Sequence, residues 1–165
     1  MEASMKDLGA LAIEQRILKL GDTLHHQANA VFRELGLEFD SRWSSVFRLL
    51  HKEGPCTSSD LADALGHNHH EILHITRPMI EIGLIEVHKD RLEGNTRLMK
   101  LSVKALSLLP ELSQVWERLD MVYVNLFRSA QCEITSVLDR VERAMGNANI
   151  SERVLTSLEE ATTTA

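Results

Sequence analysis

Long hydrophobic runs, cysteines and catalytic motifs are all scarce in this chain of 165 residues. No run approaches the roughly 20 apolar residues that a membrane-spanning helix needs, so we expect no membrane partner. The N-terminus has no basic segment leading into an apolar block, which predicts the absence of a secretory signal. Two cysteines cannot form a disulfide framework in a chain of this length, and this favours a reducing compartment. We therefore expect a cytoplasmic protein.

Enzyme signatures are missing as well. The sequence contains no Gly-rich phosphate loop, no nucleophile elbow and no paired acidic motif at the end of a predicted strand. We therefore expect neither an enzyme nor a bound cofactor.

The net charge of −6 argues at first sight against a polyanionic partner, because binding to a duplex draws on Lys and Arg at the phosphates. The distribution of charge matters more than its sum. From His88 to Lys104, five Lys or Arg residues stand against two Asp or Glu residues, which leaves a local charge of +3. Six of the eight histidines lie between His51 and His88, where they can add positive charge below about pH 6.5.

Residues 58–101 form the segment around which the rest of the chain is organised. Apolar residues recur with helical spacing from Ser59 to Leu65, and Gly66 tolerates the positive φ at which that helix must end. The pattern then predicts a helix over 68–82 and two strands, over 84–89 and 96–101, joined by a polar tip. Helix, turn, helix and hairpin in this order are the plan of a winged helix-turn-helix.

The predicted helix over 68–82 has two different sides. One side is an apolar stripe that must face a core, formed by Ile72, Ile75, Met79 and Ile82. His70, Leu73, His74 and Arg77 lie roughly opposite, where a buried helix would not need polar residues. Pro78 removes a backbone hydrogen bond inside this helix, so we expect a bend near residues 73–77.

Long amphipathic helices flank this central segment. One is predicted from Leu8 to Leu35. Ser102 is the expected N-cap of a second, in which Pro110 should cause a kink or a restart. A third follows Ser129, and Ser151 is the expected cap of a short last helix. Each apolar stripe exceeds what one small domain can cover, so a second copy of the chain is the natural partner. The sequence predicts a mainly α fold with a small β-hairpin wing, divided into an N-terminal dimerisation helix (1–36), a winged core (37–104), C-terminal dimerisation helices (105–160) and a disordered tail (161–165).

The segments LADALGHNHHEILHITRPMIEIGLI and NTRLMKLS, together with the flanking helices, resemble the MarR family of bacterial transcription regulators. The resemblance spans nearly the whole chain. The segment ALSLLPELSQVWERLD, with ISERV far downstream, is closest in pattern to the MarR-like domain found ahead of acetyltransferase domains.

The resemblance implies a homodimer that binds double-stranded DNA sequence-specifically and regulates transcription, with the second helix of each motif in a major groove. It implies that the DNA-binding residues are Asn68, His69, His70, Leu73, His74 and Arg77 on that helix and Lys89, Arg91, Asn95 and Arg97 on the wing. The family wing usually carries an Asp-Arg-Arg-like group before its second strand, and here Glu93, Gly94 and Asn95 replace it. The family also includes members that respond to a small-molecule effector.

Several alternatives remain open at this point. His70 and His74 are one helical turn apart, as helical zinc ligands are, but contact with a groove is our preferred interpretation and we expect no metal. Trp43, Phe47 and Trp116 are candidates for an effector pocket, or are simply core residues. The acidic balance, the altered wing and Pro78 favour a second function, a dimeric winged-helix scaffold for protein interactions with little DNA affinity.

Overall fold

The computed structural model describes residues 8–89, 97–147 and 149–163, and the chain divides into two compact units, Met1–Trp116 and Glu117–Ala165. The first unit contains η1 (Gly9–Ala12), α1 (Ile13–Glu34), η2 (Ser41–Trp43), α2 (Ser44–Glu53), α3 (Ser58–Leu65), α4 (His69–Glu81), β1 (Ile85–Lys89), β2 (Arg97–Leu101) and the beginning of α5 (Val103–Ser129). The second contains the rest of α5, α6 (Ile134–Asn147) and α7 (Ile150–Thr163). This confirms the predicted mainly α fold with a hairpin wing.

The helix-turn-helix is fixed by local signals at each end of α3. A capping box opens the helix, because Thr57 Oγ1 accepts a hydrogen bond from the Asp60 backbone N–H and the Asp60 carboxylate accepts one from that of Thr57. Gly66 ends it in the left-handed conformation, with φ of 66°. The predicted stop is therefore confirmed.

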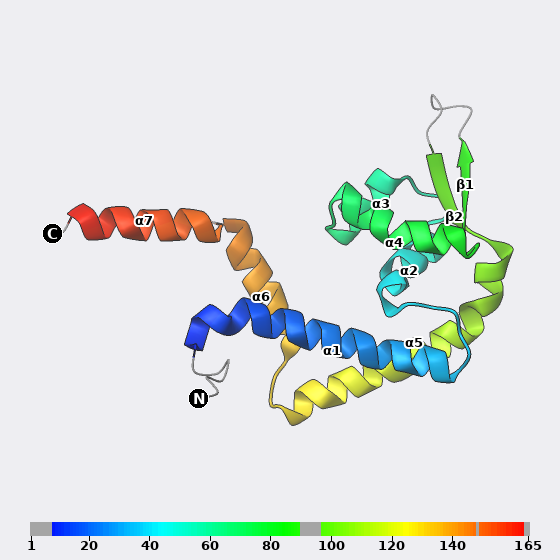
Figure 1. Ribbon diagram of the computed structural model, residues 1–165, viewed down its shortest axis with the longest axis horizontal. Helices are drawn as coiled ribbons and strands as arrows, with labels where there is room; N and C mark the ends of the chain where they lie inside the picture. The colour runs from blue at the N-terminus through cyan, green and yellow to red at the C-terminus, as the bar shows by residue number, and fades with distance from the viewer. Residues whose placement is uncertain (1–7, 90–96, 148, 164–165) are drawn as a thin grey trace. The chain divides into compact units, whose positions relative to one another are not determined.

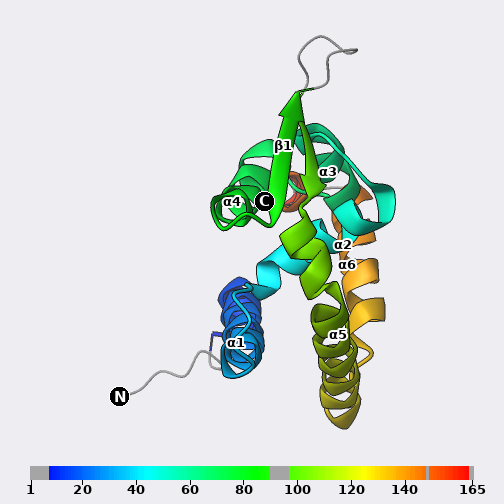
Figure 2. The ribbon, with the colours of Figure 1, turned by 90° about the vertical axis from the view of Figure 1, so that its right-hand side faces the viewer.

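The strands pair antiparallel, with Ile85 opposite Leu101 and Lys89 opposite Arg97. The helices α2, α3 and α4 lie against the base of this hairpin (Figures 1 and 2). Outside the two strands, a single antiparallel bridge joins Cys56 to Met99. The next pair of ladder hydrogen bonds would need the Gly54 backbone N–H, which instead donates to the Leu50 carbonyl oxygen at the end of α2.

The core of the first unit joins its helices and hairpin. Its largest fully buried apolar side chains come from five helices and the start of the hairpin: Phe32, Val46, Phe47, Leu61, Ile72, Met79, Leu84 and Leu112. Burying one such side chain contributes about 1.5–3 kcal/mol, so these contacts dominate the free energy of folding.

Ser102 connects α4 to α5, as its predicted capping role requires. Its hydroxyl donates to the Gly83 carbonyl oxygen at 2.6 Å and accepts from the Ala105 backbone N–H at 3.0 Å. The side chain therefore caps α5 and holds the turn that follows α4. Helix α5 then continues through Pro110, where the sequence predicted a kink or a restart, and no end occurs there.

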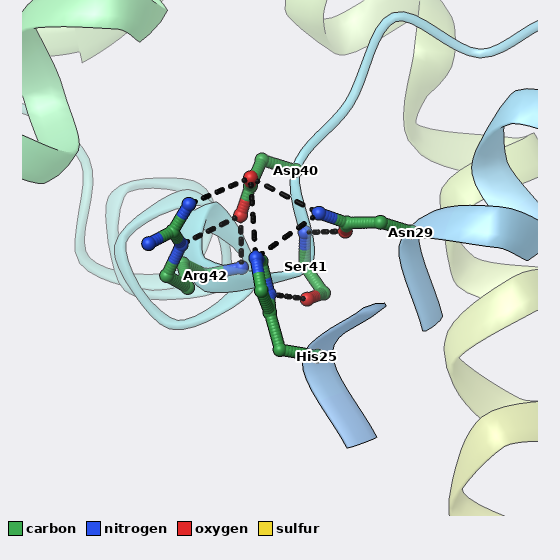
Figure 3. A network of polar contacts seen from close by, with 5 residues as sticks. All are labelled: His25, Asn29, Asp40, Ser41 and Arg42. Atoms are coloured by element: carbon green, nitrogen blue, oxygen red, sulfur yellow. Dashed lines mark hydrogen bonds and ion pairs between the residues drawn. The ribbon is translucent and has the colours of Figure 1, made fainter. Parts of the chain in front are cut away.

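A polar cluster ties α1 to the segment that opens the winged core (Figure 3). Asn29 donates to the Asp40 carboxylate at 3.1 Å and accepts from the Ser41 backbone N–H at 2.7 Å. His25, one turn earlier on α1, contacts Ser41 Oγ at 2.7 Å through Nδ1. The Arg42 guanidinium reaches both Asp40 oxygens at 3.2 Å. This junction was not predicted from the sequence.

Asn29 and His25 also contact each other within this cluster. Asn29 Nδ2 lies 3.2 Å from His25 Nε2, and an amide nitrogen can only donate. The same His25 nitrogen lies 3.7 Å from Asp40 Oδ2, so it faces both the Asn29 amide and the Asp40 carboxylate. Both polar atoms of the Asn29 side chain, Oδ1 and Nδ2, therefore have hydrogen-bond partners.

The flanking helices differ from expectation at their ends. The first turn of the N-terminal helix is 3-10, and α1 proper begins at Ile13. Helix α7 is capped by Asn149 rather than by Ser151, because Asn149 Oδ1 accepts from the Glu152 backbone N–H at 2.9 Å. It runs to Thr163, into the segment predicted to be a disordered tail. Among the described helices, none is long and apolar enough to cross a bilayer.

Candidate nucleic-acid interface

The second helix of the motif, α4, begins with a reciprocal cap. Asn68 Oδ1 accepts from the Glu71 backbone N–H at 3.0 Å, and Glu71 Oε2 accepts from the Asn68 backbone N–H at 2.8 Å. His67 lies 3.2 Å from the same Glu71 oxygen. The backbone hydrogen bond from Asn68 is the main cause that lowers the pKa of Glu71, so this carboxylate stays ionised at neutral pH.

The cap limits what Asn68 can do in a groove. Bidentate recognition of adenine uses both the oxygen and the nitrogen of an Asn side chain. The Asn68 oxygen is already engaged at the start of the helix. Asn68 therefore cannot make that contact without releasing the cap, which contributes about 1 kcal/mol to helix stability.

The inner side of α4 packs into the core and orients the helix. Ile72 and Met79 are fully buried, and Ile75 and Ile82 are half-buried, as the predicted stripe requires. Thr76 is also buried, and its hydroxyl is satisfied by donating to the Ile72 carbonyl oxygen at 2.8 Å. The helix continues through Pro78 to Glu81. The bend predicted for residues 73–77 stays a prediction.

The outer side of α4 is displayed to solvent. Its exposed residues include His69, His70, Leu73, His74 and Arg77. Neither a hydrogen bond nor an ion pair joins these five side chains to another described residue, so the imidazole and guanidinium groups are available to a ligand. The structure thus brings five of the six predicted positions on this helix together on one accessible surface, which we name the outer α4 face.

The wing is described only in part. Arg97 opens β2 and is exposed, and Lys89 lies opposite it at the end of β1. Arg91 and Asn95 lie outside the described residues. The predicted wing contacts therefore stay a prediction.

Ion pairs reduce the local positive charge that the sequence count assigned to the hairpin. Lys100 lies 3.3 Å from Glu86, its partner in the strand register, and Lys104 lies 3.6 Å from Glu38. His88 also approaches Glu86, at 3.1 Å, and together with Lys100 it lowers the pKa of that carboxyl. Exposed pairs contribute only about 0–1 kcal/mol, so a phosphate can compete with Glu86 for Lys100.

The three candidate effector residues belong to an aromatic cluster. Phe47 is fully buried and lies 5.6 Å from Trp116 and 5.9 Å from Phe39, measured between ring centroids. Trp43 packs edge-on against Phe39, and Trp116 Nε1 donates to Ser44 Oγ at 3.0 Å. Phe47 is thus part of the core, whereas Trp43 and Trp116 are only half-buried.

Metal and thiol chemistry find little support in the described part of the chain. No group of three or more His, Cys, Asp or Glu residues there could hold a metal ion, so His70 and His74 lack further ligands.

Cys56 Sγ donates to the Gly54 carbonyl oxygen at 3.4 Å, and burial and nearby carboxylates raise the pKa of its thiol. This thiol therefore stays protonated and unreactive at neutral pH.

Neither protein-family models nor curated protein sequences gave a match to this chain. Solved structures did. The PcaV transcriptional regulator from Streptomyces coelicolor, in complex with its natural ligand, has a TM-score of 0.62 at 16% identity and covers 90% of this chain and 99% of its own. MepR from S. aureus, bound to DNA, has a TM-score of 0.65 at 12% identity, over 80% of this chain and 97% of its own.

The transcriptional regulator BldR from Sulfolobus solfataricus is also similar, with a TM-score of 0.59 at 17% identity, over 84% of this chain and 95% of its own. These comparisons give no support to the narrower resemblance to domains that precede acetyltransferases. At such identities the similarity establishes the fold. The chain has the MarR-like winged-helix fold of these transcriptional regulators.

Proposed function

We propose that this protein is a homodimeric, sequence-specific DNA-binding transcription regulator of the bacterial cytoplasm, and that it responds to a small-molecule effector. In this function α4 of each subunit enters a major groove and the wing lies near the adjacent minor groove. The observation that carries the proposal is the outer α4 face. Three imidazoles, one guanidinium and one aliphatic side chain are exposed there, while the opposite side of the same helix is anchored in the core.

The chemistry of this face fits a duplex better than a protein core. Arg77 can donate two hydrogen bonds to the O6 and N7 atoms of guanine, and histidine can donate to bases or phosphates. The one carboxylate at the start of α4, that of Glu71, is held by the cap and by His67. Its Oε2 is therefore engaged within the protein rather than directed at a phosphate.

The second unit supports the dimer. None of its described residues is buried, and apolar side chains on its helices are about half exposed: Leu138, Val141 and Met145 on α6, and Ile150, Val154, Leu155 and Leu158 on α7. Helices of this kind gain their stability from covering an apolar side. We infer that a second copy of the chain provides the cover, with the isologous contacts expected of a two-fold dimer.

The effector part of the proposal is based on Trp43 and Trp116. Both are half-buried at the edge of the aromatic cluster, where an apolar ligand could stack on them. PcaV was solved with its natural ligand, and this makes a ligand-responsive role reasonable for a chain of the same fold. These two residues are the only tryptophans of the chain, so intrinsic fluorescence would report on such binding.

The decisive experiment selects bound duplexes from a random pool and measures the salt dependence of binding to the selected site. Neutralisation of phosphates predicts that log K falls by roughly 0.9 per contact for each log unit of salt. A selected consensus with a steep salt slope supports the regulator. Failure to enrich any duplex, with no binding at low salt, would refute it.

One specific observation favours the alternative of a protein-interaction scaffold with little DNA affinity. Two lysines around the hairpin are paired with Glu86 and Glu38, and the chain carries a net charge of −6. A scaffold of this kind would remain dimeric but show weak, sequence-independent duplex binding. The selection experiment therefore separates the two functions.

A further inference from the structure

Leu73 is chemically unlike its neighbours on the outer α4 face. It is 39% exposed, although it is a large aliphatic side chain. His69 and His70 lie one turn before it and Arg77 lies one turn after it, so it is surrounded by groups that donate hydrogen bonds. Leu73 itself can neither donate nor accept.

The floor of a major groove offers one apolar feature to such a side chain. Guanine, adenine and cytosine present donors and acceptors there, whereas thymine also presents its 5-methyl group. An aliphatic side chain pressed against polar edges would leave those groups without partners, which is unfavourable. A thymine methyl group removes that penalty and adds buried apolar contact.

We propose that Leu73 determines specificity by contacting the 5-methyl group of one thymine in each half-site of the operator. This inference rests on the proposed DNA-binding function and specifies what the outer α4 face selects. The surroundings of Leu73 complement the acceptors of a groove, because the hydrogen-bond donors His69, His70, His74 and Arg77 are all exposed around it. The capped Asn68 and Glu71 leave the base-facing role to these later positions.

The test removes the methyl group without changing the base pairing. Duplexes carrying the selected site are prepared with each thymine replaced singly by deoxyuridine, and their affinities are measured by fluorescence anisotropy. At one thymine in each half-site we expect the replacement to weaken binding about fourfold, the amount expected for one buried methyl group. Replacement at other thymines should leave the affinity nearly unchanged.

Protein variants assign that effect to a residue. In Leu73→Ala the deoxyuridine replacement should have no further effect, because the partner of the methyl group is gone. Leu73→Met, which keeps an apolar side chain, should remain sensitive. Ile80→Ala is the matched control, since Ile80 is a 38% exposed aliphatic residue on the same helix, and it should keep the full fourfold effect.

The outcomes distinguish the role of Leu73 from DNA binding by the protein as a whole. If the wild type binds its selected duplex but no thymine is sensitive, or if Leu73→Ala retains the sensitivity, the role of Leu73 is overturned and DNA binding stands. If the wild type binds no duplex, both are overturned. Thermal melting of each variant, followed by circular dichroism, verifies that the exposed substitutions leave the fold intact.

Discussion

The Asn29 carboxamide holds two consecutive residues of a different segment, donating to the Asp40 carboxylate at 3.1 Å and accepting from the Ser41 backbone N–H at 2.7 Å. Together with the contact of His25 with Ser41, this side chain attaches α1 to η2, and η2 also contacts α4. The N-terminal helix and α4 are therefore connected through η2. The strength of this junction can be measured directly.

Asn29→Asp should destabilise the protein by about 2 kcal/mol or more. The change keeps the shape of the side chain, but it removes both donated hydrogen bonds and sets a second carboxylate beside Asp40. Urea unfolding of the two proteins measures the difference in free energy. Gln27→Glu, the same chemical change at an exposed position of α1, should alter stability by less than about 0.5 kcal/mol. Equal effects of both substitutions would refute the role of the junction.

Asp40 should make stability depend on acid pH. Burial raises the pKa of its carboxyl, but hydrogen bonds and charge from Arg42, with a hydrogen bond from Asn29, outweigh burial and lower the pKa below its ordinary value of 3.8. A lowered pKa in the folded state stabilises the protein above 3.8, and this stabilisation is lost as the pH falls through the folded value. The wild type should therefore exceed Asp40→Asn in unfolding free energy at pH 6. The difference should shrink below pH 3.8, and a constant difference would contradict the assignment.

Arg77→Ala should weaken binding to the selected duplex far more than binding to random duplex. A bidentate contact with guanine discriminates by about 1–3 kcal/mol, whereas a phosphate contact acts equally on all sequences. Anisotropy titrations on both duplexes measure the two losses. Arg48→Ala, which removes an exposed arginine of α2, is the matched control and should spare specificity. Equal losses on both duplexes after Arg77→Ala would reassign Arg77 to a phosphate.

Duplex binding should be tighter at pH 6 than at pH 8. Imidazole in general gains positive charge as the pH falls toward 6, and three histidines, His69, His70 and His74, are exposed on the face we assign to DNA. The salt slope should also steepen at pH 6, by up to roughly 0.9 for each additional phosphate contact. Replacing the three by Asn should flatten the profile, whereas His26→Asn, on the exposed surface of α1, should not. A flat profile in the wild type would remove the histidines from the interface.

Val141→Glu should convert the dimer into a monomer or unfold the second unit. Val141 is 50% exposed on the apolar stripe of α6, and a buried unpaired carboxylate at an interface is strongly unfavourable. Analytical ultracentrifugation gives the oligomeric state over a concentration series. Ser136→Glu, on the opposite side of α6, introduces the same charge and should leave the mass unchanged. A wild-type protein that is monomeric at all concentrations would refute the dimer.

The order of elements could be predicted because its signals are local. The apolar spacing before Gly66, the helical stripe from Ile72 to Ile82 and the change of period after Gly83 each depend on residues a few positions apart. The outer α4 face followed from the same periodicity. Thr76 was missed because its polarity suggests exposure, although a hydroxyl bonded to the carbonyl one turn earlier can be buried at little cost.

Contacts between distant segments could not be predicted in the same way. Asn29 and Asp40 are eleven residues apart, and Lys104 meets Glu38 across most of the first unit. Such partners depend on how helices dock, which periodicity does not specify. The pair between Glu86 and Lys100 was missed for a smaller reason. Aligning the predicted strands, 84–89 and 96–101, by their ends would have placed Glu86 opposite Met99, one residue away from its observed partner.

The Ser102 hydroxyl has a mechanical consequence. It bonds the carbonyl oxygen of Gly83, just beyond the last turn of α4, while it caps the first turn of α5. The two helices therefore share an anchor at Ser102, and we expect a change in the tilt of α5 to move the C-terminal end of α4 with it.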